Sequence, residues 1–124
     1  MKFTGISRTF SLAGEDQYNT IGAFWDEMAE KYELENLRGL GYGWKGGTME
    51  YAIGLKEGDI EGYNVSVELP DCRWCVANGR TDELKELYDE IYTDGALDFE
   101  IETFYENGDC TVEYYRKGGR NDGK

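Results

Sequence analysis

The chain has 124 residues, of which 40% are hydrophobic and 15% aromatic, and its formal net charge is −13 from 26 acidic and 13 basic residues. This length predicts one domain, and the acidity argues against direct nucleic-acid binding while favouring cationic ligands or basic partners. Acidity alone fits a role in solubility equally well. No run is apolar enough to cross a membrane, no signal-peptide core follows Met1, and three Cys do not make a disulfide framework. We therefore expect a cytoplasmic protein without membrane contact.

The first half of the chain predicts the order strand, helix, strand, strand. Ile21, Trp25, Met28 and Tyr32 recur at helical spacing, and polar residues occupy the positions between them. Glycines at every second position from residue 39 to 43 predict a strand with one bare face, where another segment or a ligand comes close. The expected bounds are a strand over 3–10, a helix capped by Asn19 or Thr20, and strands over 39–44 and 48–56.

The second half repeats this pattern after one additional strand. Alternation over residues 63–69 ends at Pro70, and the repeat comprises a strand over 72–77, a helix capped by Thr81, and a hairpin over 99–117. Two such units predict an α+β fold of tandem pseudo-symmetric βαββ repeats, with antiparallel sheets, two helices packed on one side and a central ligand cleft. We expect the domain to span residues 1–117 and residues 118–124 to form a disordered tail.

The hairpin carries the candidate site. A two-residue turn at Asn107-Gly108 places Glu102 opposite Glu113. The same register places Phe104 opposite Thr111 and Glu100 opposite Tyr115, and these six residues share one face. The other face of the hairpin is then the core face, and its residues are Phe99, Ile101, Thr103, Tyr105, Cys110, Val112 and Tyr114.

Like charges directly opposite on a sheet destabilise it, so the two glutamates either face water or serve a ligand. A solvated sheet face is the simpler interpretation. The neighbouring rings of Phe104 and Tyr115 favour a ligand cleft, because aromatic faces attract cations. Further candidate wall residues, each of which also fits a core role, are Tyr42, Trp44, Tyr51 and Trp74.

Cys72 and Cys75 have the spacing of a metal or redox motif, but one further Cys and no His cannot complete a zinc site. We interpret both as packing residues and expect no metal and no cofactor.

The chain resembles the GyrI-like small-molecule-binding domain, which is also the effector-binding domain of bacterial multidrug-responsive transcription regulators. The resemblance extends from Gly5 to Lys117. It depends on these segments, taken in order: Gly5-Ile6-Ser7-Arg8-Thr9-Phe10, Phe24-Trp25, Tyr51-Ala52-Ile53-Gly54-Leu55, Glu68-Leu69-Pro70, Trp74-Cys75-Val76-Ala77, Ile101-Glu102-Thr103-Phe104 and Glu113-Tyr114-Tyr115.

The resemblance implies a tandem βαββ fold with an aromatic cleft around a buried acid, and it places the family's acids on Glu113 and Glu102. It implies a stand-alone binding domain for cationic or lipophilic aromatic ligands rather than an enzyme. One alternative is a hydrolase of reactive small electrophiles that uses Glu113 and Tyr115. The other is an acidic inhibitor or partner of a basic, DNA-binding protein such as gyrase or a separate regulator. No helix-turn-helix segment is present in the sequence, so we do not expect this chain alone to be a DNA-binding regulator.

Overall fold

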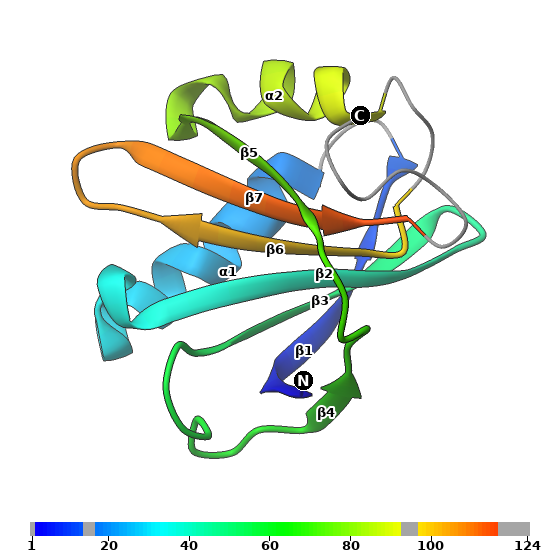
Figure 1. Cartoon of the computed structure of the whole chain (residues 1–124). Helices are drawn as coiled ribbons and strands as arrows, with labels where there is room; N and C mark the ends of the chain where they lie inside the picture. The colour runs from blue at the N-terminus through cyan, green and yellow to red at the C-terminus, as the bar shows by residue number, and fades with distance from the viewer. Residues whose placement is uncertain (1, 14–16, 93–96, 117–124) are drawn as a thin grey trace.

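A computed structural model of the chain describes residues 2–13, 17–92 and 97–116. Within them, seven strands form one open antiparallel sheet in the order β4-β1-β3-β2-β6-β7-β5, and two α-helices accompany it (Figure 1). The α+β class predicted from the sequence is confirmed. The strands are β1 (Lys2–Ser11), β2 (Leu37–Lys45), β3 (Thr48–Leu55), β4 (Val65–Glu68), β5 (Cys75–Arg80), β6 (Phe99–Phe104) and β7 (Asp109–Tyr115), and the helices are α1 (Gln17–Tyr32) and α2 (Leu84–Ile91).

Helix α1 lies against the sheet through large apolar side chains at helical spacing. Phe24, Trp25 and Met28 are buried in one cluster with Met49 and Tyr51 of β3, as the apolar stripe predicted. The expected cap at Asn19 or Thr20 was wrong, because the helix already begins at Gln17. The additional residues bring Tyr18 into contact with a second buried cluster, so the longer helix covers more apolar surface.

Helix α2 lies over the same face of the sheet at the β5 edge. A 3-10 turn over Thr81–Glu83 precedes it, so the helix begins at Leu84 rather than directly after Thr81. Tyr88 and Ile91 are buried with Val112 of β7. At the other end of the helix, the Arg116 guanidinium donates a hydrogen bond to the Ile91 carbonyl, which satisfies one of the carbonyls that a helix end leaves free.

The opposite face of the sheet has a smaller apolar core of its own. Leu40, Ala52 and Ile101 are buried there beneath Leu69 and Trp74 of the connection from β4 to β5. The Trp74 indole N–H donates to the Pro70 carbonyl at 3.1 Å, which holds this cover in place. The central strands are therefore covered on both faces, which explains why they are rich in buried residues at successive positions.

The hairpin between β6 and β7 differs from the predicted one by one residue. The Gly108 N–H donates to the Tyr105 carbonyl at 3.0 Å, the Tyr105 N–H donates to the Asp109 carbonyl at 3.0 Å, and Gly108 has a φ of 91°. These features define a three-residue loop with a left-handed glycine, which an Asn-Gly pair fits as well as it fits a two-residue turn. The observed partners are Phe104 with Cys110, Glu102 with Val112, Ile101 with Glu113 and Glu100 with Tyr114.

This shift separates the two glutamates that were expected to face each other. Glu102 and Glu100 lie on the helix-covered face with Val112 and Tyr114, whereas Glu113 lies on the opposite face with Ile101. The predicted assignment of the acidic residues and the core residues to separate faces was therefore wrong. A slip of one residue moves every side chain of a strand to the other face, because side chains alternate with a period of two.

The expected disordered tail over 118–124 lies outside the described residues. Within the described part of the chain, no helix combines the length and the apolar character that crossing a membrane requires.

We expect Gly108→Ala to lower the free energy of unfolding by about 1–2 kcal/mol, because a left-handed backbone strains any residue with a Cβ. Urea titration measures this loss. Gly22→Ala in α1 is the matched control, since a Cβ there meets nothing within 4 Å and alanine favours the helix. A Gly108→Ala protein as stable as the wild type would contradict the three-residue loop.

Candidate functional site

A cavity of about 570 Å³ lies between the two helices and the sheet face that they cover. Its floor comes from β3 and β6, and its walls come from α1, α2 and the turns beside them. The wall is mostly apolar and contains eight aromatic residues, namely Tyr18, Trp25, Trp44, Tyr51, Tyr88, Tyr92, Phe104 and Tyr105. Two of its residues, Glu100 and Glu102, are acids that are only 4% exposed.

The Glu102 carboxylate is the point at which four elements of the fold meet. Its Oε1 accepts a hydrogen bond from the Tyr51 hydroxyl of β3, and its Oε2 accepts one from the Tyr88 hydroxyl of α2. The Trp25 indole N–H of α1 donates to the Tyr51 hydroxyl oxygen at 2.8 Å. The direction of this chain of hydrogen bonds follows from its donors, because an indole N–H can only donate and the Tyr51 O–H is then left to donate to the carboxylate.

Glu100 lies two residues earlier on the same face of β6 and is held more weakly. The Tyr92 hydroxyl donates to its Oε2 at 3.3 Å. Room for the side chain comes from β2, since a Cβ on Gly41 would lie 2.7 Å from Glu100 Oε1. Gly39 similarly leaves space for the Tyr51 ring and for Trp25. The bare glycine face predicted from the sequence is thus occupied by the residues that surround the acids.

Burial raises the pKa of both glutamates above the usual value of 4.5, and it raises that of Glu100 well above it. The charge of Glu102 adds to the effect on Glu100. Hydrogen bonds offset part of the rise in both acids, from Tyr88 and Tyr92 on Glu100 and from Tyr51 and Tyr88 on Glu102. Desolvation, followed by the nearby carboxylates, also raises the pKa of Tyr51 and Tyr88. Of the two acids, Glu100 therefore holds a proton more firmly, and the tyrosines remain neutral donors.

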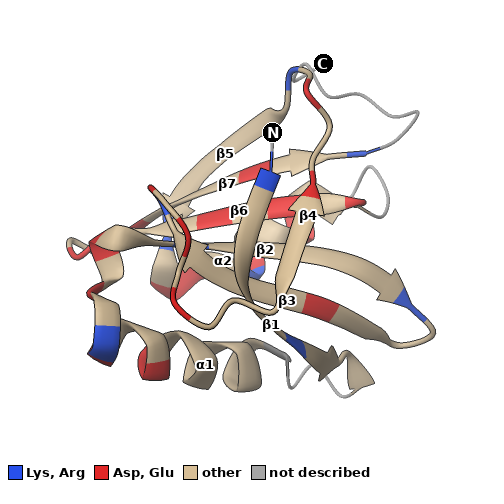
Figure 2. Ribbon diagram, turned by 90° about the horizontal axis from the view of Figure 1, so that it is seen from below, with Lys and Arg blue, Asp and Glu red and all other residues tan. Residues whose placement is uncertain are grey.

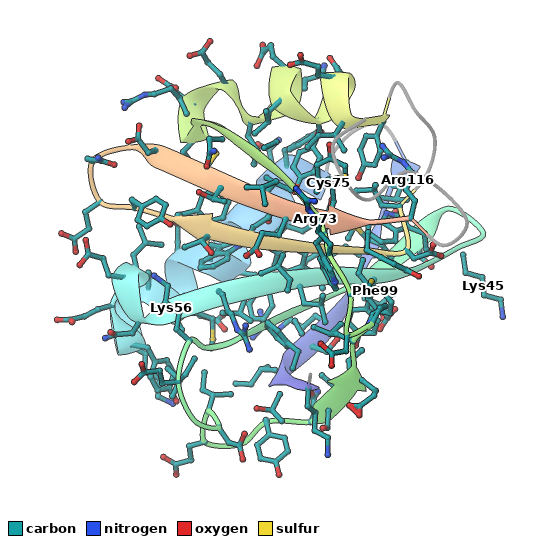
Figure 3. The ribbon with its side chains drawn as sticks, in the orientation of Figure 1. Lys45, Lys56, Arg73, Cys75, Phe99 and Arg116 are labelled. Atoms are coloured by element: carbon teal, nitrogen blue, oxygen red, sulfur yellow. The ribbon has the colours of Figure 1, made fainter. Side chains whose placement is uncertain are left out.

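The basic residues of the sheet point elsewhere. Figure 3 shows Lys45 extending outward from the end of β2. Arg116 is engaged with the Ile91 carbonyl, Arg38 lies over the Phe3 ring at 4.9 Å, and Lys56 lies over the Tyr105 ring at 5.5 Å. Figure 2 shows acidic positions within β6, in the interior of the sheet. Among the described residues, the hydrogen-bond partners of Glu100 and Glu102 are tyrosine hydroxyls, and no ion pair joins either acid to a Lys or Arg.

The structure brings together half of the residues predicted for the site. Those that line the cavity are Trp44, Tyr51, Glu102 and Phe104. Those that do not line it are Tyr42, Trp74, Glu113 and Tyr115. The ring of Trp74 instead packs with those of Phe99 and Tyr115, at centroid distances of 6.2 and 5.9 Å, and the Tyr42 hydroxyl hydrogen-bonds with Ser7 at 2.7 Å.

Two local irregularities account for this division. The three-residue hairpin loop turns Glu113 and Tyr115 away from the helices. In β2, the register shifts between Tyr42 and Lys45, and Gly43 has a φ of 64°. This bulge places Trp44 on the cavity side, although strict alternation would have kept it on the face of Tyr42.

Sequence reasoning missed Glu100, Tyr88 and Tyr92 as site residues. Tyr88 lies in the helix predicted after Thr81 and is buried, and its hydroxyl donates to Glu102. A buried tyrosine needs a hydrogen-bond partner, and this requirement was the available signal for an acid beneath the helix.

Within residues 2–13, 17–92 and 97–116, no group of three or more Cys, Asp or Glu side chains is placed to hold a metal ion. Cys75 is buried at the start of β5, whereas Cys72 is exposed before the strand. The interpretation of Cys72 as a packing residue was therefore wrong. No protein-family model, curated protein or solved structure matches the chain.

We expect Glu100→Gln to stabilise the protein increasingly as the pH rises above about 4.5. Below that pH the carboxyl is protonated in both states. Above it, the unfolded chain ionises freely while the folded protein holds the proton, so the wild type loses stability with rising pH. The gap between variant and wild type should widen by at most about 1.4 kcal/mol per pH unit. Urea titrations across this range measure it, with Glu113→Gln on the opposite face as control, and a constant gap would contradict a proton held by Glu100.

Proposed function

We propose that the protein binds cationic aromatic or lipophilic small molecules in this cavity. The observation that carries the proposal is the pair of buried glutamates without a basic partner among the described residues. A buried charge is unfavourable unless it is paired. A ligand with a positive charge supplies the missing partner.

The size and lining of the cavity support the same class of ligand. A volume of about 570 Å³ lies within the range of sites for drug-sized molecules. The rings of Trp25, Tyr88 and Tyr92 stand around the acids, and an aromatic face attracts a cation by roughly 0.5–2 kcal/mol. Aromatic walls with an acidic floor favour a flat or lipophilic cation over a small hydrated ion.

The order of strand pairing supports tandem pseudo-symmetric βαββ repeats and with them the resemblance to GyrI-like domains. In the first half β1 pairs with β3 and β3 with β2, and in the second half β5 pairs with β7 and β7 with β6. The pairing of β2 with β6 joins the halves. In the proposed assignment, the acids that serve the ligand are Glu102 and Glu100 rather than Glu113.

Tetraphenylphosphonium and tetraphenylborate test the proposal, because they have nearly the same shape and opposite charge. We expect tetraphenylphosphonium to bind and to quench Trp25 fluorescence, and tetraphenylborate to be rejected. The double substitution Glu100→Gln and Glu102→Gln should weaken tetraphenylphosphonium binding at least about tenfold, since it removes the charges and keeps the shape.

Glu113→Gln is the matched control for this experiment and should leave affinity unchanged. Near-ultraviolet circular dichroism establishes that each variant keeps its packed aromatic core. Equal binding of both ions, or an equal loss in Glu113→Gln, would exclude the acid pair as the recognition element.

One arrangement also favours a second candidate, a hydrolase of small electrophiles. Glu102 is held between two tyrosine hydroxyls and has a raised pKa, and a carboxyl group with a raised pKa can act as a general acid or base. Incubation with an epoxide, followed by chromatography of the diol product, tests this function. We expect turnover, if the protein is such a hydrolase, to be lost in Glu102→Gln and in Tyr51→Phe and to persist in Tyr115→Phe. Turnover that survives Glu102→Gln would exclude this site as its origin.

A further inference from the structure

Glu100 and Glu102 present two carboxyl groups to one cavity from a single strand. One residue separates them on β6, so their Cα atoms lie about 7 Å apart. Both are 4% exposed, and both line the cavity. Two acidic centres at this spacing exceed what one positive charge on a ligand can neutralise.

The other ionisable groups around the pair do not supply the missing charge. Burial first, and neighbouring carboxylates second, raise the pKa of the Tyr51 and Cys110 side chains, and the same causes act on the two tyrosines of the α2 wall. All four are neutral at pH 7. Among the described residues, the titratable groups that face the pair or line the cavity are, by element, Tyr18 and Asp26 from α1, Tyr51 from β3, Cys110 and Tyr114 from β7, Tyr105 from the hairpin loop, Asp82 from the 3-10 turn, and Lys85, Tyr88 and Tyr92 from α2 and its end.

The exposed side chains that line the cavity carry a negative net charge. Asp26, Asp82 and Lys85 are exposed cavity-lining residues, and together they contribute one negative charge. Strand β2 faces the acids with Gly39 and Gly41, which carry no charge. The described surroundings therefore leave the acid pair uncompensated.

The two acids differ in how well their charge is supported. Glu102 accepts hydrogen bonds on both oxygens, from Tyr51 and Tyr88, and such bonds stabilise the ionised form. Glu100 accepts one longer bond of 3.3 Å from Tyr92. The hydrogen bonds therefore support the negative charge of Glu102 better than that of Glu100, so Glu100 is the member of the pair that keeps a proton more readily.

We propose that the cavity is built for ligands with two positive charges, the first pairing with Glu102 and the second pairing with Glu100 when Glu100 releases its proton. This inference rests on the proposed function. A singly charged ligand pairs with Glu102 and leaves Glu100 protonated, so its affinity changes little with pH. The affinity of a doubly charged ligand rises with pH, because the proton and the second charge compete for the same carboxylate.

Ethidium and propidium test the inference, because they share one ring system and carry one and two permanent charges. Calorimetry at pH 7 in two buffers of different ionisation enthalpy counts the protons released on binding. We expect propidium to release up to about one proton and ethidium close to none. Between about pH 5.5 and 8, the Kd of propidium should fall by up to about tenfold per pH unit, while that of ethidium stays nearly constant.

Glu100→Gln should abolish proton release by propidium and make its Kd as insensitive to pH as that of ethidium. Glu113→Gln should leave both dyes unchanged. Propidium binding without proton release, or the same pH dependence for both dyes, would overturn the inference while leaving the proposed function intact. Failure of both dyes to bind the wild type would instead count against the proposed function, and the inference would fail with it.

Discussion

The Glu102 carboxylate is the interaction on which the arrangement of this fold depends. Its two oxygens are held by tyrosines from β3 and α2, and Trp25 of α1 continues the chain of hydrogen bonds. A carboxylate buried inside an apolar cluster is unfavourable unless its oxygen atoms accept hydrogen bonds. The same hydrogen bonds that make the acid tolerable also fix the distance between the two helices, and the cavity lies in the space that this distance leaves.

The sheet makes this arrangement sterically feasible. Gly39 and Gly41 remove two side chains from β2 at the positions where Tyr51 and Glu100 cross it. The opposite face of the central strands is covered by its own apolar cluster, so these strands are packed on both faces. The cavity can therefore contain polar groups at a position where a one-sided sheet would need its core.

Much of the fold was predictable from periodicity, and much of the site was not. The stripe of Trp25 and Met28 and the alternation around Tyr51 identified elements correctly, because the residues that a helix or strand buries must recur with its period. The faces of β6 and β7 were wrong, because Asn107-Gly108 is compatible with two loop lengths and only tertiary packing selects one. The partner of Tyr88 lies 14 residues away at Glu102, and no local pattern encodes that contact.

The three-residue loop between β6 and β7 has a consequence for how such a protein changes during evolution. If the turn closed over Asn107-Gly108 alone, Glu106 would join β6, and the pairing of all of β7 would slip by one residue. Glu113 would then join Glu102 beneath the helices, and Val112 would leave the core. A change of turn type alone would alter the charge and the volume of the cavity together, a change that many separate substitutions would be needed to reproduce. Turn length, as much as residue identity, determines what this cavity can hold.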